Sequence, residues 1–326
     1  MLKLVLSLLP TTVLAWVPPR FVSSQVPSCG SWHGRMLKVI AATAAAATRH
    51  GGGNVVVIGA NTGPGAGGAD PIFDWLNSTK AGKLLDKIVY VEPLPVIFRV
   101  LQHNLQHAEH AVALNLGIAN TSGTLDIYCL GLDQDVSATA TGQAPTLRIS
   151  QEATRLGVPG FATMTCSLNR ERLFSTTDFA RSGRWGGLHA MRNLTAYEAL
   201  ITRHPVQVIT FAQLMQQHVR GRVLYMQIDV EGRDDDVVLQ ALRTIPAAEL
   251  PVVIMFEISL IAVYESRVRQ VMNALSSRGY RLCWGSKNLV AQRDDARGSG
   301  APTSRSNASG ASPSPEAMRQ GKDGRL

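Results

Sequence analysis

Four acidic residues in this sequence stand where an apolar run ends, which is where a parallel strand presents side chains to a ligand. A carboxylate at such a position can accept both ribose hydroxyls of a nucleoside. It can also take up a proton from a reacting hydroxyl group. Sequence position alone makes these residues the first candidates for chemistry; they are Glu92, Asp229, Glu231 and Glu257.

Another apolar run, at residues 55–58, ends in the small-residue stretch Gly59-Ala60-Asn61-Thr62-Gly63. Glycine allows a sharp turn and a close approach of the backbone to a ligand, because no Cβ intervenes. The following GPGAGG stretch matches Gly-x-Gly-x-x-Gly. That match begins beyond the strand end, and Pro64 removes a backbone donor, so we interpret it as a flexible loop.

The elements that must position these residues alternate between strands and helices, which predicts an α/β fold with a doubly wound, mainly parallel sheet. The carboxyl ends of its strands would bring the acids and the glycine loop to one edge. The predicted strands are residues 55–58, 87–91, 111–118, 123–130, 206–211, 222–230 and 251–258, with 280–292 as a strand or hairpin. The predicted helices are residues 36–49, 95–107, 212–218, 234–243 and 264–278.

The chain divides into one domain at residues 51–292 and flanking segments of different composition. Within the domain, residues 131–205 are polar and weakly periodic, so we interpret them as a functional insertion or as a partly disordered segment. Residues 293–326 are rich in Ser, Gly, Pro and Arg with few large apolar side chains, so we predict a disordered tail.

Taken in order, several stretches resemble the FkbM-type S-adenosylmethionine-dependent methyltransferases. The resemblance covers about residues 55–290 apart from the insertion, and its most specific piece is IDVEG. The stretches are GANTG at 59–63, Glu92-Pro93, NLGIANTSGTL at 115–125, IDVEG at 228–232 and Phe256-Glu257.

The resemblance implies a seven-stranded Rossmann-like methyltransferase sheet with helices on both faces, and methyl transfer from S-adenosylmethionine, usually to a hydroxyl oxygen. The acceptor would be a small molecule, a glycan or a lipid. Asp229 and Glu231 would be catalytic, as a base or as electrostatic positioning groups. Glu231 has an equal structural interpretation as a helix cap. The implied cofactor-binding residues are Gly59, Ala60, Asn61, Gly63, Glu92, Asn120 and Asp229.

Two positions depart from the family pattern, which usually has Asp where this chain has Val57 and Lys where it has Gln227. Because of these departures, a second interpretation stays open, in which the chain is a catalytically inactive relative that binds a nucleoside. An NAD(P)-dependent oxidoreductase would explain the glycines and Glu92 but not IDVEG, and no tyrosine has a lysine four residues later. No metal site is predicted, because three histidines on one helical face, at 103, 107 and 110, have no identifiable partner ligand.

Composition constrains partner and compartment. The net charge of +8 is spread along the chain with no block of five like charges, so we do not expect nucleic-acid binding. The four cysteines permit disulfides but form no Cys-x-x-Cys pair. Residues 1–15 have the features of a signal peptide, and their apolar core is too short to remain as a membrane span.

Residues 16–50 contain no acidic side chain. They are interpreted either as the second part of a two-part plastid presequence or as an ordinary N-terminal helix. The expected location is therefore non-cytosolic, in the secretory pathway or Golgi, or in a plastid.

Overall fold

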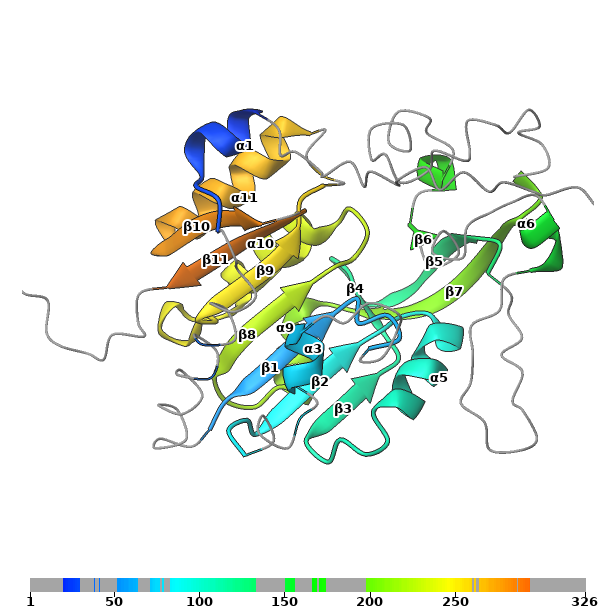
Figure 1. The fold of residues 1–326 in the computed structure, drawn as a ribbon, viewed down its shortest axis with the longest axis horizontal. Coiled ribbons are helices and arrows are strands. Elements are labelled where there is room, and N and C mark those ends of the chain that lie inside the picture. The colour runs from blue at the N-terminus through cyan, green and yellow to red at the C-terminus, as the bar shows by residue number, and fades with distance from the viewer. Residues whose placement is uncertain are drawn as a thin grey trace, which may run out of the picture. The chain divides into compact units, whose positions relative to one another are not determined.

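In the computed structural model, the apolar runs of the sequence form a seven-stranded sheet in the order β10-β11-β9-β8-β1-β2-β3 (Figure 1). Neighbours from β9 to β3 pair in parallel, whereas β11 runs antiparallel to both β9 and β10. The predicted doubly wound, mainly parallel methyltransferase sheet is therefore confirmed. Its strands are β1 (Asn54–Ile58), β2 (Lys87–Val91), β3 (Ala111–Leu114), β8 (Val223–Ile228), β9 (Val253–Glu257), β10 (Tyr280–Gly285) and β11 (Asn288–Arg293).

The structure describes residues 20–29, 38, 41, 52–63, 71–76, 78, 83–132, 150–155, 166–168, 170–173, 198–259, 261, 264–285 and 287–293. The predicted signal peptide, the GPGAGG loop beyond Gly63, most of the insertion and the predicted tail after Arg293 lie outside these residues. Of the predicted helix at 36–49, Lys38 and Ala41 are described, and both are helical.

Helices cover both faces of the seven-stranded sheet because alternate residues of its strands point to opposite sides. Val56 and Ile58 of β1 belong to one buried cluster, and Val55 and Val57 to another. The first cluster packs against α1 (Arg20–Gln25), α9 (Phe211–His218), α10 (Asp234–Thr244) and α11 (Glu265–Ser277). The second packs against α3 (Pro71–Leu76) and α5 (Pro95–Asn104).

The ends of these helices follow local signals. Pro95 opens α5 at a position where a missing N–H costs nothing. At the start of α9, Thr210 and Gln213 form a capping box in which each side chain accepts the other residue's backbone N–H, at 3.2 and 2.9 Å.

A second sheet has four strands in the order β4-β7-β5-β6. The sequence did not predict it as a separate sheet. The predicted strand at 111–118 was wrong, because it splits into β3 and β4, and the predicted strand at 206–211 starts earlier, inside the proposed insertion. Its strands are β4 (Gly117–Ile118), β5 (Gly123–Leu130), β6 (Cys166–Ser167) and β7 (Ile201–Ile209).

Short elements and two disulfides complete the described structure. The short helices are α6 (Gln151–Arg155), η3 (Arg170–Leu173) and η5 (Ala247–Glu249). Cys29 pairs with Cys283, and Cys129 pairs with Cys166. Among the described helices, none has the length and apolar character required to cross a membrane.

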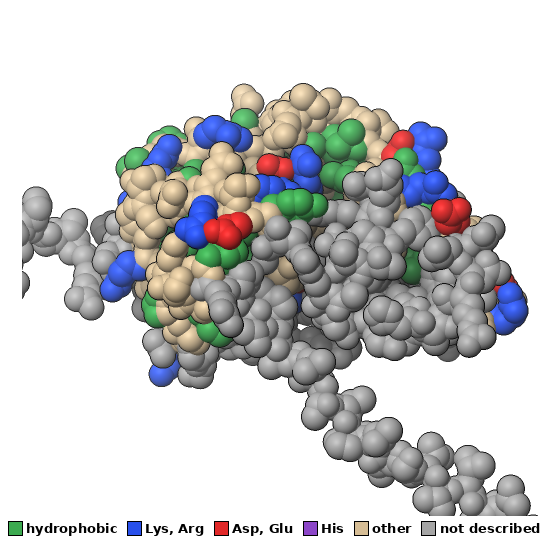
Figure 2. Space-filling model, turned by 90° about the horizontal axis from the view of Figure 1, so that it is seen from above, with side chains coloured by type: hydrophobic (Ala, Val, Ile, Leu, Met, Phe, Trp, Pro, Cys, Tyr) green, Lys and Arg blue, Asp and Glu red, His purple; other side chains and the backbone are tan. Residues whose placement is uncertain are grey.

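The described surface seen from above carries basic and acidic side chains interspersed with apolar ones (Figure 2). This agrees with a net charge of +8 that is spread along the sequence. The described basic side chains on this face lie in separate groups and form no continuous patch (Figure 2).

Candidate functional site

A pocket opens at the carboxyl edge of the seven-stranded sheet, where the second sheet forms its other wall. On the side of the large sheet its lining includes five predicted site residues: Gly59, Asn61, Glu92, Asp229 and Glu231. The opposite wall is mostly apolar and comes from the four strands of the small sheet and the residue after β6: Gly117, Ile118, Leu125, Ile127, Cys166, Ser167, Leu168 and Val208.

The turn after β1 is held tightly between the neighbouring strands. The N–H groups of Gly59 and Ala60 both donate to the carbonyl oxygen of Val91, at 2.9 and 3.0 Å, and Asp229 N–H donates to Ile58 O at 2.9 Å. Gly59 has a φ of 77°. A Cβ there would lie 1.8 Å from the carbonyl oxygen of Asp229, so a residue with a side chain cannot take this place without moving the backbone.

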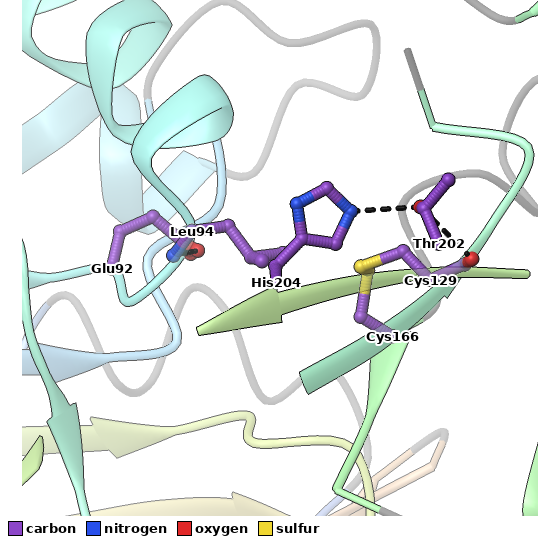
Figure 3. The surroundings of a disulfide bond; sticks show 6 residues. All are labelled: Glu92, Leu94, Cys129, Cys166, Thr202 and His204. Atoms are coloured by element: carbon purple, nitrogen blue, oxygen red, sulfur yellow. Dashed lines mark hydrogen bonds between the residues drawn. A yellow bond between two sulfur atoms is a disulfide. The ribbon is translucent and has the colours of Figure 1, made fainter. Parts of the chain in front are cut away.

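Glu92 follows β2 and reaches under this turn. Its Oε2 accepts the N–H of Asn61 at 2.9 Å. Its Oε1 accepts the N–H of Leu94 at 3.0 Å (Figure 3). Burial raises the pKa of Glu92 to about 7, although these two backbone hydrogen bonds lower it. The carboxylate is thus fixed in place, and each oxygen retains a lone pair for a further donor.

Asn115 is a residue that the sequence reasoning missed. Its side-chain amide donates to the carbonyl oxygens of Glu92 and Pro93, both at 3.0 Å. These bonds lie in the gap between β3 and β4, so they explain why the predicted strand is interrupted there. They also fix the backbone that carries the Glu92 carboxylate. The quoted stretch NLGIANTSGTL begins at Asn115, and this asparagine next to a strand end was the available signal.

Asp229 lies in a cluster of carboxylates. Burial, then the charges of Glu257 and Glu231, raise its pKa well above the usual value, and Lys287 opposes this shift. Lys287 Nζ lies 3.1 Å from Glu257 Oε2 and 3.9 Å from Asp229 Oδ2. Asp229 Oδ1 is buried and has no hydrogen-bond partner among the described residues. The cluster therefore holds one carboxylate oxygen available beside the pocket.

The structure separates the roles of Glu257 and Lys287 from that of Asp229. Glu257 is 1% exposed and bonded to Lys287 and to the hydroxyl of Ser259, so its carboxylate has a structural role. Lys287 was missed, because it lies in the turn between β10 and β11, far from IDVEG in sequence. The predicted hairpin at 280–292 was its one sequence signal.

The IDVEG turn is shaped by a different acid from those proposed as catalytic. Asp234 accepts the N–H of Val230 at 3.3 Å and that of Gly232 at 3.1 Å. Burial, then the charge of Glu257, raises its pKa to about 8. Glu231 has a φ of 52° and lines the pocket. Asp234 thus holds the turn that places Glu231 in the lining.

The two departures from the family pattern are neighbours across two strands. Val57 of β1 is in register with Gln227 of β8, and both side chains are buried, at 0% and 8% exposure. Tyr225 donates its hydroxyl to Gln227 Oε1 at 3.1 Å. Replacing only one residue of an Asp–Lys pair would leave an unpaired buried charge. Here both positions are neutral, so neither departure leaves a buried charge without its partner.

Three of the predicted cofactor-binding residues lie outside the pocket lining. Ala60 is buried and Gly63 has a φ of 68°, so both shape the turn rather than line the pocket. Asn120 is exposed beyond β4. The predicted helix at 95–107 ends earlier, because α5 stops at Asn104, so His107 and His110 lie beyond it and the three histidines do not share a helical face. His110 Nε2 lies 2.8 Å from Leu76 O, and no metal-binding group of three ligands occurs among the described residues.

Comparison with known protein families finds that the Methyltransferase FkbM domain matches residues 58–282, more than half of the 326 residues. A methyltransferase FkbM from Methylobacillus flagellatus KT superposes with a TM-score of 0.39 and 10% identity over 74% of this chain and 43% of that one. The fibrillarin pre-rRNA processing protein of Methanococcus jannaschii gives a TM-score of 0.32 and 9% identity over 74% and 66%. The chain thus spans less than two thirds of either protein. Comparison with curated proteins finds no match.

Proposed function

Since this chain belongs to the FkbM methyltransferase family, we propose that it transfers the methyl group of S-adenosylmethionine to a hydroxyl oxygen of a small molecule, glycan or lipid. The observation that carries the proposal is the Glu92 carboxylate. It is buried beneath the glycine turn, held by two backbone N–H groups, and has a pKa of about 7.

The residues present fit this cofactor. Glu92 has the position and the free lone pairs to accept the two ribose hydroxyls. Gly59 lines the pocket, and its turn keeps a fixed shape because any Cβ there would collide with Asp229 O. The unpartnered Oδ1 of Asp229 provides a carboxyl oxygen on the same side of the pocket. S-adenosylmethionine supplies an electrophilic methyl group on a positively charged sulfur.

The chain's own contribution is alignment and proton transfer. The acceptor oxygen must lie in line with the methyl group, which an enclosed pocket achieves by restricting the acceptor's orientation. As the new oxygen–carbon bond forms and the sulfur–carbon bond breaks, the acceptor's hydroxyl proton must leave. Asp229 is the proposed base, because its Oδ1 is unpartnered beside the pocket and its raised pKa makes the carboxylate a stronger base. Glu231 would assist from the same wall.

The direct test is calorimetric titration of the full chain with S-adenosylmethionine, S-adenosylhomocysteine and NADP. Glu92→Ala is the test variant, and Glu249→Ala, an exposed acid in η5, is the matched control. We expect both sulfur nucleosides to bind the wild type and Glu249→Ala. Binding to Glu92→Ala should be at least tenfold weaker, since charge-assisted hydrogen bonds contribute about 1.5–3 kcal/mol each.

Other results would contradict the proposal. Binding of NADP alone would favour an oxidoreductase. Failure of all three ligands to bind would favour a relative that has lost its cofactor. Equal losses in Glu92→Ala and Glu249→Ala would remove the assignment of Glu92 to the cofactor.

A further inference from the structure

The segment at residues 20–29, here called the N-terminal strap, packs into the core on one face of the seven-stranded sheet. Val22 of α1 is 0% exposed and Val26 is 3% exposed, and both belong to the cluster that covers one face of the seven-stranded sheet. The ring of Phe21 lies under the guanidinium of Arg269 in α11, at 5.2 Å. In Figure 1, α1 lies beside α11 at the β10 end of the sheet.

The strap also covers the exposed edge of the sheet. β10 is the last strand of the seven, so its outer side would otherwise present unpaired backbone groups. Trp284 N–H donates to Pro27 O at 3.0 Å, and Cys29 N–H donates to Trp284 O at 2.7 Å. Ser28 and Trp284 form a parallel bridge at this point. The strap thus adds one β-bridge to the sheet on the outer side of β10.

A covalent bond fixes the same place. Cys29 and Cys283 form a disulfide with a Cα–Cα distance of 5.1 Å across a sequence separation of 254 residues. Cys29 is 4% exposed. Packing, backbone pairing and the disulfide all join the strap to one strand and one helix of the domain.

We propose that processing of the chain occurs upstream of Arg20, and that the strap stays in the mature enzyme as a disulfide-tethered cover for the β10 edge. Hydrolysis of the Ala15–Trp16 bond, at the end of the signal-peptide pattern, is the matching cleavage. Of the two sequence interpretations of residues 16–50, the proposal selects a retained N-terminal element and excludes a presequence that is removed as far as residue 50.

The physical reason is the cost of removal. A chain cut after residue 50 would expose the cluster under Val22 and Val26, leave Cys283 unpaired and free the Trp284 backbone groups at a sheet edge. The tether itself requires an oxidising compartment. There the two thiols lose two protons and two electrons, which a protein disulfide oxidoreductase takes up as its own disulfide is reduced to two thiols.

The first test is the N-terminus of the mature protein. The full chain is produced in a eukaryotic secretory host, and intact mass, N-terminal peptide sequencing and a non-reducing peptide map are recorded. We expect an N-terminus upstream of Arg20 and a linked peptide pair that contains Cys29 and Cys283. A folded protein that begins beyond Cys29, or Cys29 recovered as a free thiol, would overturn the proposal.

The second test separates the strap's two attachments. Cys29→Ser removes the tether, and Val22→Asp disrupts the packing, with Gln25→Asp on the exposed side of the same helix as control. We expect the first two to lower the thermal midpoint by about 5–10 °C and the control to stay within about 2 °C of wild type. Wild-type midpoints for both Cys29→Ser and Val22→Asp would show that the strap is dispensable. If Val22→Asp does not fold, the thermal midpoint of Cys29→Ser alone tests the proposal, and a wild-type midpoint for that variant would contradict it.

Discussion

The two sheets meet at one pocket but contribute to it differently. The seven-stranded sheet supplies its charged and conformationally constrained groups, namely the turn at Gly59 and the carboxylates of Glu92 and Asp229. The four-stranded sheet supplies an apolar wall, whose Leu168 is 41% exposed. The large sheet holds its groups through backbone contacts between neighbouring parallel strands. The small sheet holds β6 through two residue pairs with β5 and one disulfide.

This difference teaches where the site tolerates change. A group fixed by the backbone of two neighbouring strands cannot move without disturbing the core. A half-exposed apolar side chain just after a short strand, such as Leu168, can be replaced at little cost. We therefore expect substitutions to have large effects on the side of the large sheet and small effects on the side of the small sheet.

The largest effect is expected for Gly59→Ala, with Gly279→Ala as control. Both glycines have positive φ, at 77° and 82°, but a Cβ at Gly59 meets Asp229 O at 1.8 Å and one at Gly279 meets nothing within 4 Å. Gly279→Ala should cost about 1 kcal/mol of unfolding free energy from the backbone conformation alone. Gly59→Ala should cost about 4 kcal/mol or more and abolish S-adenosylhomocysteine binding. Denaturant unfolding and calorimetry measure both, and equal costs for the two variants would show that the close contact has no role.

A double-mutant cycle at Val57 and Gln227 tests whether their joint departure from the family pattern is one change. Val57→Asp and Gln227→Lys each bury an unpaired charge, and each should lower the unfolding free energy by about 3 kcal/mol. The double variant should regain about 1–3 kcal/mol of the summed loss through the new ion pair between register partners. Additive losses in chemical denaturation would mean that the two positions are independent.

The pH dependence of cofactor binding is expected to report Glu92. Because its pKa in the free protein is about 7, only the ionised form present above that pH accepts two ribose hydroxyls. S-adenosylhomocysteine affinity should therefore rise about tenfold between pH 6 and pH 8. Glu92→Gln should remove this dependence, and a wild-type affinity that is flat over the same range would contradict the assignment.

The same group affects the stability of the ligand-free protein in the opposite direction. The pKa of Glu92 is raised on folding, so its stabilising contribution is complete below its ordinary pKa and is lost as the pH rises through about 7. Thermal midpoints of the wild type, relative to those of Glu92→Gln, should fall from pH 5 to pH 8. The ligand and the fold thus favour different protonation states of one carboxyl group.

The smallest effect is expected for Leu168→Ala on the wall of the small sheet. Its side chain is 41% exposed, so truncation should change the unfolding free energy by no more than about 0.5 kcal/mol. S-adenosylhomocysteine affinity should change by less than about threefold, because a few exposed methyl groups contribute little burial. A loss comparable to that of Gly59→Ala would contradict the proposed division between the two sheets.

The sequence by itself determined the large sheet and most of its site. Buried parallel strands are continuous apolar runs, and the residue at the end of each run is readable, so Gly59, Glu92, Asp229 and Glu257 could all be assigned to one edge. The predicted helices 212–218, 234–243 and 264–278 were each found within one residue at either end, because amphipathic periodicity and terminal signals are local.

Only the tertiary structure decided the small sheet, the disulfide pairing and the contacts of Lys287 and Asn115. Strands β4 and β6 have two residues each, too short for any periodic signal, and the exposed positions and Pro205 of β7 hid its first half. Four cysteines allow three pairings, which their spacing does not distinguish. Lys287 lies near Asp229 from a separate hairpin, and Asn115 donates to the Glu92 backbone from the end of the neighbouring strand β3. Such contacts depend on which strands become neighbours, which is set by the packing of the whole domain rather than by any local pattern.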